Sequence, residues 1–261
     1  MYHISCYLTL KSFILKLKSK MQHVLILGCG RSGTSIFGEL FQHLDAYTYH
    51  SEPPFKELIK WDYNKLLAVK VPREDAGLKP DAGLSFPLSV LMEHFAKPHQ
   101  IFWQVRHPLD AIASLKVGIS KNWGHHPQPK DWQQWLSQPL VKQCAHHWNY
   151  INTVGYSKVR DLVKITWFED MLADPYQFAL DLTKELGIDI ETNRKALSTW
   201  AKRVQNTNNK HFIEAETSRP YSTKDHKVKV GRWKENLTKK EVDMVLPMIK
   251  KTAEEFGYDL P

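Results

Sequence analysis

The sequence predicts a single α/β domain with a doubly wound, mostly parallel sheet and helices on both faces. Short, continuously apolar runs alternate along the chain with longer segments of helical periodicity. Strands that are apolar on both faces are typical of parallel sheets enclosed between helices. A chain of 261 residues with 42% hydrophobic and 25% charged residues suits one globular domain of this kind.

The first predicted element is a strand at residues 24–27, which is followed by a loop with three glycines and a helix at residues 34–43. Further apolar runs predict strands at residues 66–71, 101–106 and 162–168. Prolines close the first two of these runs, which supports their assignment as strands.

The remaining helices are predicted from apolar residues that recur at helical spacing. They lie at residues 88–95, 109–117, 141–157, 175–186, 192–204 and 238–256, and Thr238 is the expected N-cap of the last one. Residues 118–139 are rich in Trp, His, Pro and Gln and are predicted to form a surface insertion. A polar, basic stretch is expected at residues 205–234.

We expect residues 1–20 to be an appendage and residues 21–261 to form the domain. The apolar part of the appendage is interrupted by Lys11 and Lys16, so it is too short and too charged to span a bilayer. Its positive charges follow the apolar part, which is the reverse of a secretory signal. No stable membrane insertion is therefore expected, with an anchor on a membrane surface as the alternative.

The charge and the cysteines restrict the partners and the compartment. A net charge of +8 favours anionic partners, namely nucleic acid, a membrane surface or a ligand with several phosphates. No nucleic-acid-binding motif is recognised in the sequence, so we expect no nucleic-acid partner. Three scattered cysteines suggest neither a disulfide framework nor a zinc site and favour a reducing compartment, so the cytoplasm is the expected location.

The loop after the first strand has the arrangement of an anion site. Backbone N–H groups in such a loop and at the start of the next helix point at the ligand. Gly28 and Gly33 are spaced as in a P-loop, so the sheet is expected to be P-loop-NTPase-like, but Thr34 stands where that motif has its lysine. Kinases and NTPases use this lysine with Mg²⁺, whereas here Arg31 is the cation of the loop. The loop therefore favours transfer of a less charged group by fixed cations and amides without a metal.

The loop sequence Gly30-Arg31-Ser32-Gly33-Thr34-Ser35 resembles the 5′-phosphosulfate loop of sulfotransferases. These enzymes use 3′-phosphoadenosine 5′-phosphosulfate (PAPS) as donor and release 3′-phosphoadenosine 5′-phosphate (PAP). The resemblance implies that Arg31 contacts the bridging oxygen and the sulfonate. It also implies that the amides and hydroxyls of Gly33, Thr34 and Ser35 hold the 5′-phosphate.

The segment from Arg106 to Ser114 is similar to the 3′-phosphate element of the same family. Arg106, Pro108, Asp110 and Ser114 match this element, while His107 replaces the usual acid or amide. Arg106 lies at the carboxyl end of a predicted strand, so it is expected at the same sheet edge as the loop. The alternative is that Arg106 pairs with Asp110 and that Ser114 is a helix-surface residue.

Two further segments resemble family motifs. Residues 227–234 resemble the C-terminal segment that closes over the nucleotide, which implies donor contacts from Lys227, Lys229, Gly231 and Arg232. A solvated basic loop is the alternative for any one of them. Residues 165–172 resemble a family strand that ends in Tyr-Glu-Asp-Leu, with Phe168 in place of the tyrosine.

The candidate base depends on the branch of the family. Cytosolic aryl and steroid sulfotransferases have a histidine two residues after a strand lysine, but Pro72 follows Lys70 at that spacing. The chain is more similar to the Golgi-type carbohydrate and tyrosyl-protein branch, so a Golgi-like context stays open. This resemblance implies that Glu52 is the base and that Lys70 stabilises the leaving oxygen, or else is a solvated cation. His107, His125 and His126 are the rival bases.

The acceptor is expected to be a small metabolite or a glycan. Trp123, Trp132 and Trp135 in the insertion offer aromatic faces for a sugar ring or a flat apolar molecule. Alternatively, Trp132 and Trp135 pack a helix onto the core. Three other functions stay open, namely a P-loop kinase or NTPase, a basic nucleic-acid-binding module and a nucleotide-binding homologue without activity.

Overall fold

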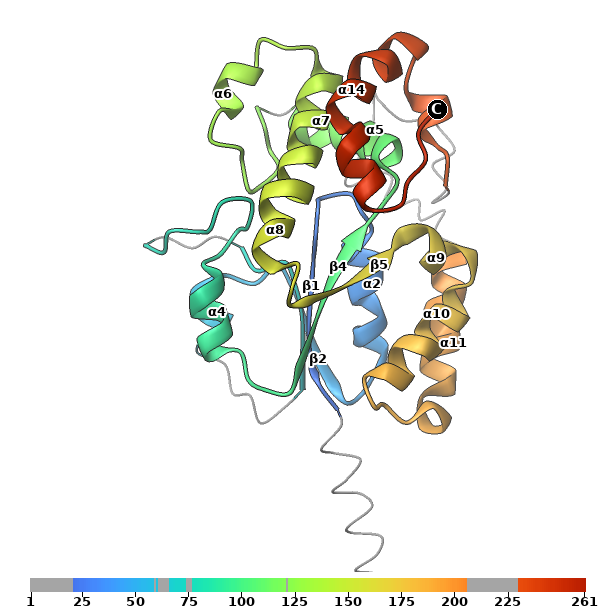
Figure 1. Cartoon of the computed structure of the whole chain (residues 1–261). Helices are drawn as coiled ribbons and strands as arrows, with labels where there is room; N and C mark the ends of the chain where they lie inside the picture. Colours follow the sequence, from blue (N-terminus) through green and yellow to red (C-terminus); the bar gives the residue numbers. More distant parts are fainter. Residues whose placement is uncertain (1–20, 59, 61–65, 74–76, 121, 206–229) are drawn as a thin grey trace, which may run out of the picture.

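The computed structural model describes residues 21–58, 60, 66–73, 77–120, 122–205 and 230–261. Its five strands form one sheet in the order β2-β3-β1-β4-β5, and every neighbouring pair is parallel. The strands are β1 (His23–Gly28), β2 (Tyr47–Ser51), β3 (Leu66–Lys70), β4 (His99–Val105) and β5 (Val163–Trp167). The predicted parallel α/β sheet is confirmed (Figure 1). The predicted appendage at residues 1–20 lies outside the described residues.

Strand β2 is the one strand that the apolar pattern did not predict. Its sequence Tyr-Thr-Tyr-His-Ser carries little apolar character, and only Tyr47 is buried. Among the strands that the structure describes, β2 lies at the edge of the sheet and pairs on one side only. An edge strand needs no continuous apolar run, so the pattern that revealed β1, β3 and β4 is missing here.

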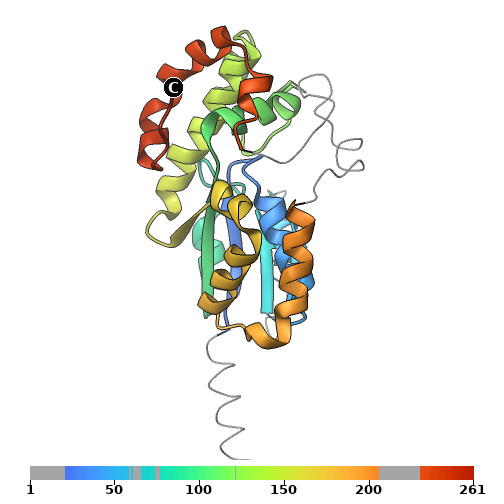
Figure 2. The same ribbon diagram turned by 90° about the vertical axis from the view of Figure 1, so that its right-hand side faces the viewer.

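One face of the sheet is covered by helices that surround Val24 and Ile26 of β1. These helices are α2 (Thr34–Glu39), the 3₁₀ helix η1 (Leu40–His43), α9 (Phe168–Ala173), α10 (Pro175–Glu185) and α11 (Ile190–Gln205). Figures 1 and 2 show α10 and α11 next to α2 along this face. Phe37 of α2 packs edge-on against Phe102 of β4, which joins helix and sheet in one apolar cluster.

The opposite face packs against a second group of helices around Leu25 and Leu27. It comprises α4 (Leu88–His94), α5 (Pro108–Ile119), α7 (Leu140–Tyr150), the π-helix η2 (Ile151–Gly155), α8 (Tyr156–Val159) and α14 (Lys239–Glu255). The predicted helix at residues 141–157 is therefore interrupted by one π-helical turn. Because alternate residues of β1 enter the two clusters, the prediction of helices on both faces is confirmed.

The insertion after α5 is packed rather than open. Trp123 is fully buried, and Trp132 and Trp135 of the short helix α6 (Trp132–Trp135) are partly buried against the core. The alternative reading of Trp132 and Trp135 as core-packing residues is therefore correct. Two other short helices are α3 (Phe55–Leu58) and α13 (Trp233–Asn236). Among the described residues, no helix is both long enough and apolar enough to cross a membrane.

Candidate active site

The phosphate loop connects the end of β1 to the start of α2. Gly28 has φ 145°, and a side chain there would lie 2.4 Å from the carbonyl oxygen of Gln104, so only glycine fits. Arg31 adopts a left-handed φ of 68°, and Gly33 caps α2 with φ 88°. The Ser32 N–H donates to the Cys29 carbonyl at 3.2 Å, which closes the turn. The loop therefore has the tight, helix-capping shape that the anion site requires.

The two predicted donor-binding motifs lie against each other. Arg31 Nε donates to Ser114 Oγ at 2.9 Å, so the loop cation and the α5 hydroxyl are in contact. Arg106 Nη1 donates to the Arg31 carbonyl at 3.1 Å, and its guanidinium lies 4.4 Å from the ring centre of Phe168. Burial lowers the pKa of Arg106, while Asp110 and Glu169 act against this effect. An anion bound here would face two arginines, one of them largely removed from water.

Lys70 and Glu52 form the polar pair beside the loop. The Lys70 ammonium lies 2.5 Å from Glu52 Oε1 and donates to Ser35 Oγ at 2.9 Å. The Lys70 side chain is only 7% exposed, whereas that of Glu52 is 45% exposed. Glu52 directly follows β2 and has φ 52°, and its N–H donates to the Lys70 carbonyl at 2.8 Å. The edge strand therefore brings the candidate base to the carboxyl end of β3.

One cleft of about 630 Å³ lies at the carboxyl edge of the sheet. Its lining includes Arg31 and the Lys70–Glu52 pair, but Arg106 and Ser114 are not among the lining residues. The polar part of its lining includes Arg31, Ser35, Glu52, Lys70, Arg73, His125 and His126, and the apolar part includes Leu84, Phe86, Trp103 and Ile151. Trp123, Trp132 and Trp135 are not among the lining residues. The tryptophans that the sequence analysis suggested for acceptor binding therefore lie outside the lining of this cleft.

The three rival histidines have different surroundings. His107 is absent from the cleft lining, and its ring stacks on Trp233 and meets the edge of Tyr258. His125 and His126 line the cleft. Burial, together with the charge of Arg31, lowers the pKa of His125 to about 4, so this imidazole is neutral at physiological pH. His107 is therefore packed between aromatic side chains outside the cleft lining, whereas His125 and His126 line the cleft.

The C-terminal segment is attached to α5 through Asp110. Its carboxylate accepts from the Gly231 and Trp233 N–H groups, both at 2.8 Å. These contacts replace the ion pair with Arg106 that the alternative reading offered. Arg232 is buried, and burial together with the nearby charge of Arg106 lowers its pKa. Gly231 and Arg232 therefore lie near the Arg106 motif, while Lys227 and Lys229 lie outside the described residues.

Glu169 is a residue whose role the sequence did not reveal. Its two carboxylate oxygens accept from the His107 N–H at 2.9 Å and from the Tyr258 hydroxyl at 2.8 Å. It thereby links the end of β5, the loop after β4 and the C-terminal residues. The motif at residues 165–172 drew attention to this position, but its partners become apparent only in the folded chain.

Comparisons with known proteins identify the family and the fold. The family model described as "Sulfotransferase domain" matches residues 21–257. A mouse sulfotransferase complexed with PAP has 16% sequence identity and a TM-score of 0.54, covering 90% of this chain and 84% of that one. Retinol dehydratase in complex with androsterone and the inactive cofactor PAP has 14% identity and a TM-score of 0.52, covering 92% and 82%.

A third structure, the sulfotransferase domain from the curacin biosynthetic pathway, has 14% identity and a TM-score of 0.50. The alignment covers 92% of this chain and 99% of that domain. At these identities the structures support the fold. A search of curated protein sequences gave no match.

Proposed function

The chain belongs to the sulfotransferase domain family, and on this premise we propose that it transfers a sulfuryl group from PAPS to a hydroxyl or amine of a small acceptor. The observation that carries the proposal is the contact of Arg31 with both Ser114 and Arg106, which joins the two predicted donor-binding motifs. A donor with phosphates at both its 5′ and 3′ positions needs two such cationic sites close together. PAP in the mouse enzyme and in retinol dehydratase supports the same donor.

In this proposal the phosphate loop, Gly30 to Ser35, binds the 5′-phosphosulfate through backbone amides and the hydroxyls of Ser32, Thr34 and Ser35. Arg106 and Ser114 bind the 3′-phosphate, and the segment held by Asp110 closes beside them with Gly231 and Arg232. Lys227 and Lys229 are proposed to add donor contacts from outside the described residues. Fixed cations and amides supply the charge stabilisation, so we expect no metal requirement.

The transfer step is assigned to Glu52, Lys70 and Arg31. The acceptor oxygen attacks sulfur, its proton passes to the Glu52 carboxylate, and the bond between sulfur and the bridging oxygen breaks. The electron pair of that bond stays on the 5′-phosphate, where Arg31 and Lys70 neutralise it. Lys70 is suited to this role because it contacts both Ser35 of the loop and Glu52. A base at Glu52, with Pro72 in the histidine position, favours the Golgi-type branch.

We propose that the acceptor is a small metabolite with a mainly apolar body rather than a glycan. The wall of the cleft that holds Glu52 also includes the apolar side chains of Leu84, Phe86 and Trp103. The hydroxyls of a sugar would lose their hydrogen bonds to water against this wall, at a cost of about 1–3 kcal/mol for each unpaired group. The complexes of retinol dehydratase with retinol and with androsterone support a small-molecule acceptor.

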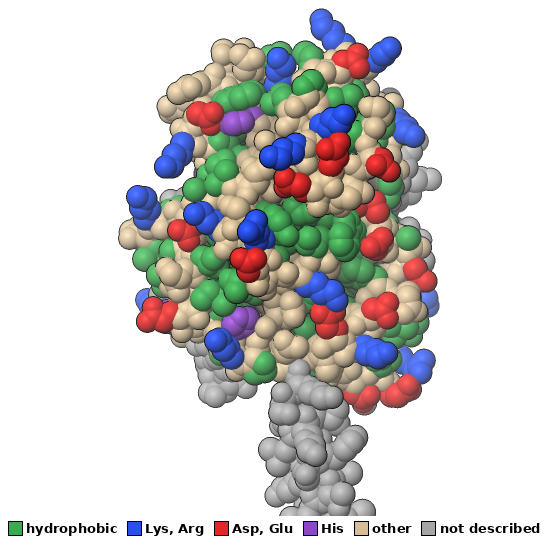
Figure 3. Space-filling model, viewed as in Figure 1, with side chains coloured by type: hydrophobic (Ala, Val, Ile, Leu, Met, Phe, Trp, Pro, Cys, Tyr) green, Lys and Arg blue, Asp and Glu red, His purple; other side chains and the backbone are tan. Residues whose placement is uncertain are grey.

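The other candidate functions have less support. A kinase or NTPase lacks its P-loop lysine here, because Thr34 takes that position. A nucleic-acid-binding surface would gather its cations into a patch or stripe. On the face seen in Figure 3, Lys and Arg side chains are instead interspersed with Asp and Glu.

Calorimetry with PAP and with adenosine 5′-phosphate, each in the presence of a chelator, tests the donor. We expect PAP to bind at least tenfold more tightly because only PAP has the 3′-phosphate that Arg106 and Ser114 contact. Equal affinities would exclude the 3′-phosphate site. Labelled PAPS offered with apolar alcohols and with monosaccharides then tests the acceptor, and transfer only to the sugars would contradict the apolar class while leaving the donor assignment intact.

A further inference from the structure

The His125 ring is inserted between the phosphate loop and helix α5. A side-chain carbon on Gly30 would lie 3.1 Å from His125 Nδ1, and one on Gly118 would lie 2.1 Å from both Cδ2 and Nε2. Both neighbours are glycines, so the imidazole packs directly on their backbones. The ring therefore occupies space that any other residue at position 118 would fill.

The segment that carries His125 is fixed by its neighbours. Trp123 is fully buried although its φ is 57°, a left-handed value that a bulky residue adopts only when its surroundings enforce it. Its indole N–H donates to His147 Nδ1 at 3.3 Å, and Gln128 Nε2 donates to its carbonyl at 2.9 Å. The Gly124 N–H donates to the Gly118 carbonyl at 3.0 Å. His125 is therefore attached to a segment whose backbone is held in place by these contacts.

Arg31 is held by two direct contacts and by packing on the residue before it. Ser114 accepts from its side chain, and Arg106 donates to its carbonyl. The residue before it is Gly30, whose backbone has wide conformational freedom unless something packs on it. His125 is the side chain that packs there.

We propose that His125 is a positioning residue that fixes the Gly30–Arg31 turn and thereby keeps the Arg31 guanidinium directed at the sulfonate. The proposal rests on the proposed function, because it assumes that Arg31 acts on the transferred group. A displacement of about 1 Å at a reacting group costs up to about a hundredfold in rate. Most of the proposed contacts to PAP, which has no sulfonate, come from residues 32–35 and from Arg106, so binding of PAP depends less on His125 than sulfuryl transfer does.

The test compares His125→Ala with His125→Phe in the full-length protein. We expect the Ala variant to lower kcat for sulfuryl transfer roughly 10- to 100-fold, with the Kd for PAP within about threefold of wild type. The Phe variant keeps a flat ring of similar size between Gly30 and Gly118, so it should recover most of the activity. Circular dichroism and the Tm establish that both variants are folded.

Gly118→Ala provides an independent route to the same effect. Alanine is a better helix former than glycine, so this variant should not weaken α5. Its methyl group would nevertheless displace the His125 ring, so we expect the same fall in kcat. In a His125→Ala background the Gly118→Ala change should have no further effect, because the two residues act through one contact.

Two results would overturn the proposal. The first is normal kcat in both His125→Ala and Gly118→Ala. The second is loss of activity in His125→Phe equal to that in His125→Ala, with loss of the basic group from the pH profile of kcat, which would make His125 the proton acceptor.

The pH profile is interpreted against the charged and titratable groups around His125, namely Arg31, Glu52, His126 and His147. If wild-type protein bound no PAP and transferred no label, the proposed function itself would be wrong, which is distinct from either result with the variants.

Discussion

Lys70 is the buried cation of the cleft, and its two contacts define its role. A buried ammonium is stable only when it is paired, and here Glu52 and Ser35 supply the partners. The same contact holds the Glu52 carboxylate beside the loop. In the proposed transfer these roles separate, since the bound donor would bring new negative charge to Lys70 and leave Glu52 to receive a proton.

Replacing Glu52 by Gln removes the proton acceptor while keeping the size of the side chain. We expect the rate of single-turnover transfer to fall on the order of 10²- to 10⁴-fold. The affinity for PAP should change by less than about threefold, because the loop amides and Arg106 remain. Glu52→Asp keeps a carboxylate and should retain more activity than the Gln variant. Unchanged turnover in Glu52→Gln would remove Glu52 as the base.

Arg106→Lys tests the 3′-phosphate site. The guanidinium contacts the Arg31 carbonyl and the Phe168 ring, and its planar fork suits a phosphate in a way that an ammonium does not. We expect PAP affinity to fall at least about tenfold while adenosine 5′-phosphate affinity stays nearly constant. Arg194→Lys, on the exposed surface of α11, is the matched control. Equal losses for both nucleotides would assign Arg106 to the loop rather than to the 3′-phosphate.

At the scale of elements, Asp110 joins helix α5 to the segment that leads into α13. One carboxylate accepts from two backbone N–H groups, and asparagine has only one oxygen to offer them. We expect Asp110→Asn to lower the free energy of unfolding by about 2–3 kcal/mol, as for loss of a hydrogen bond to a charged group, and to weaken PAP binding. Urea denaturation and calorimetry measure the two effects. Full stability with unchanged binding would show that the attachment is dispensable.

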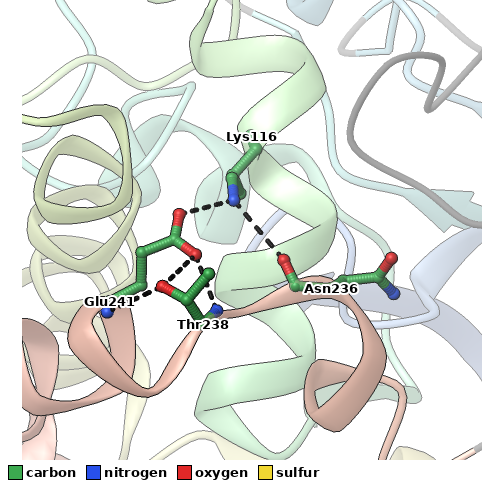
Figure 4. A network of polar contacts seen from close by, with 4 residues as sticks. All are labelled: Lys116, Asn236, Thr238 and Glu241. Carbon is green, nitrogen blue, oxygen red and sulfur yellow. Dashed lines mark hydrogen bonds and ion pairs between the residues drawn. The ribbon is translucent and has the colours of Figure 1, made fainter.

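The start of helix α14 carries a second junction, shown in Figure 4. Thr238 and Glu241 form a capping box, and Glu241 Oε1 lies 2.7 Å from the Lys116 ammonium, which also approaches the Asn236 carbonyl. Burial alone would raise the pKa of Glu241, but hydrogen bonds from Lys116 and Thr238 outweigh it and hold the pKa below its ordinary value. The ionised carboxylate is thus the form that stabilises the fold.

This depressed pKa predicts a pH-dependent stability with a definite sign. The contribution of Glu241 is fully present above its unfolded-state pKa of about 4.3 and is lost as the pH falls through the folded-state pKa. In Glu241→Gln the free energy of unfolding should therefore fall less steeply below about pH 5 than in wild type. Glu254→Gln, an exposed change on the same helix, is the control. Identical pH dependence of wild type and Glu241→Gln would contradict the assignment.

Buried strands could be predicted from the sequence, whereas the more exposed edge strand could not. The continuous apolar runs revealed β1, β3 and β4, and the fully buried Val24, Ala68 and Ile101 explain why. β2 was not predicted, because an edge strand with mostly polar side chains has no run of apolar residues in its sequence. The π-helical turn in the middle of the 141–157 segment was not predicted either. Its Gly155 packs closely against the backbone of Gly83, a contact between distant segments that local sequence does not reveal.

Site residues that lie close together in the sequence could be predicted, whereas contacts between distant segments could not. The loop residues and the Arg106 motif are short local patterns, so both could be recognised from the sequence alone and assigned to one site. The contact of the His125 ring with Gly30 and Gly118 joins three separate segments of the chain, and no local sequence pattern predicts it. The roles of Asp110 and Glu169 likewise depend on contacts with the C-terminal residues, more than 80 positions further along the chain.

At the scale of the whole molecule, the two apolar clusters share one sheet. β1 contributes alternate residues to both, so neither cluster can unfold without exposing the other side of the same strand. The proposed donor site lies at the carboxyl edge of this strand, with Ser35 on the α2 side and Ser114 on the α5 side. Ligand binding should therefore stabilise both halves together.

Calorimetric unfolding of the full chain tests whether residues 21–261 act as one domain. We expect a single transition, and PAP at about 100 times its Kd should stabilise the folded state by about 2.7 kcal/mol. For a domain of this size that corresponds to an upward shift of roughly 5–10 °C in the Tm. Adenosine 5′-phosphate at the same concentration should give a smaller shift because it lacks the group that Arg106 contacts. Two transitions, of which PAP moves only one, would instead divide the chain into a nucleotide-binding unit and a separate unit.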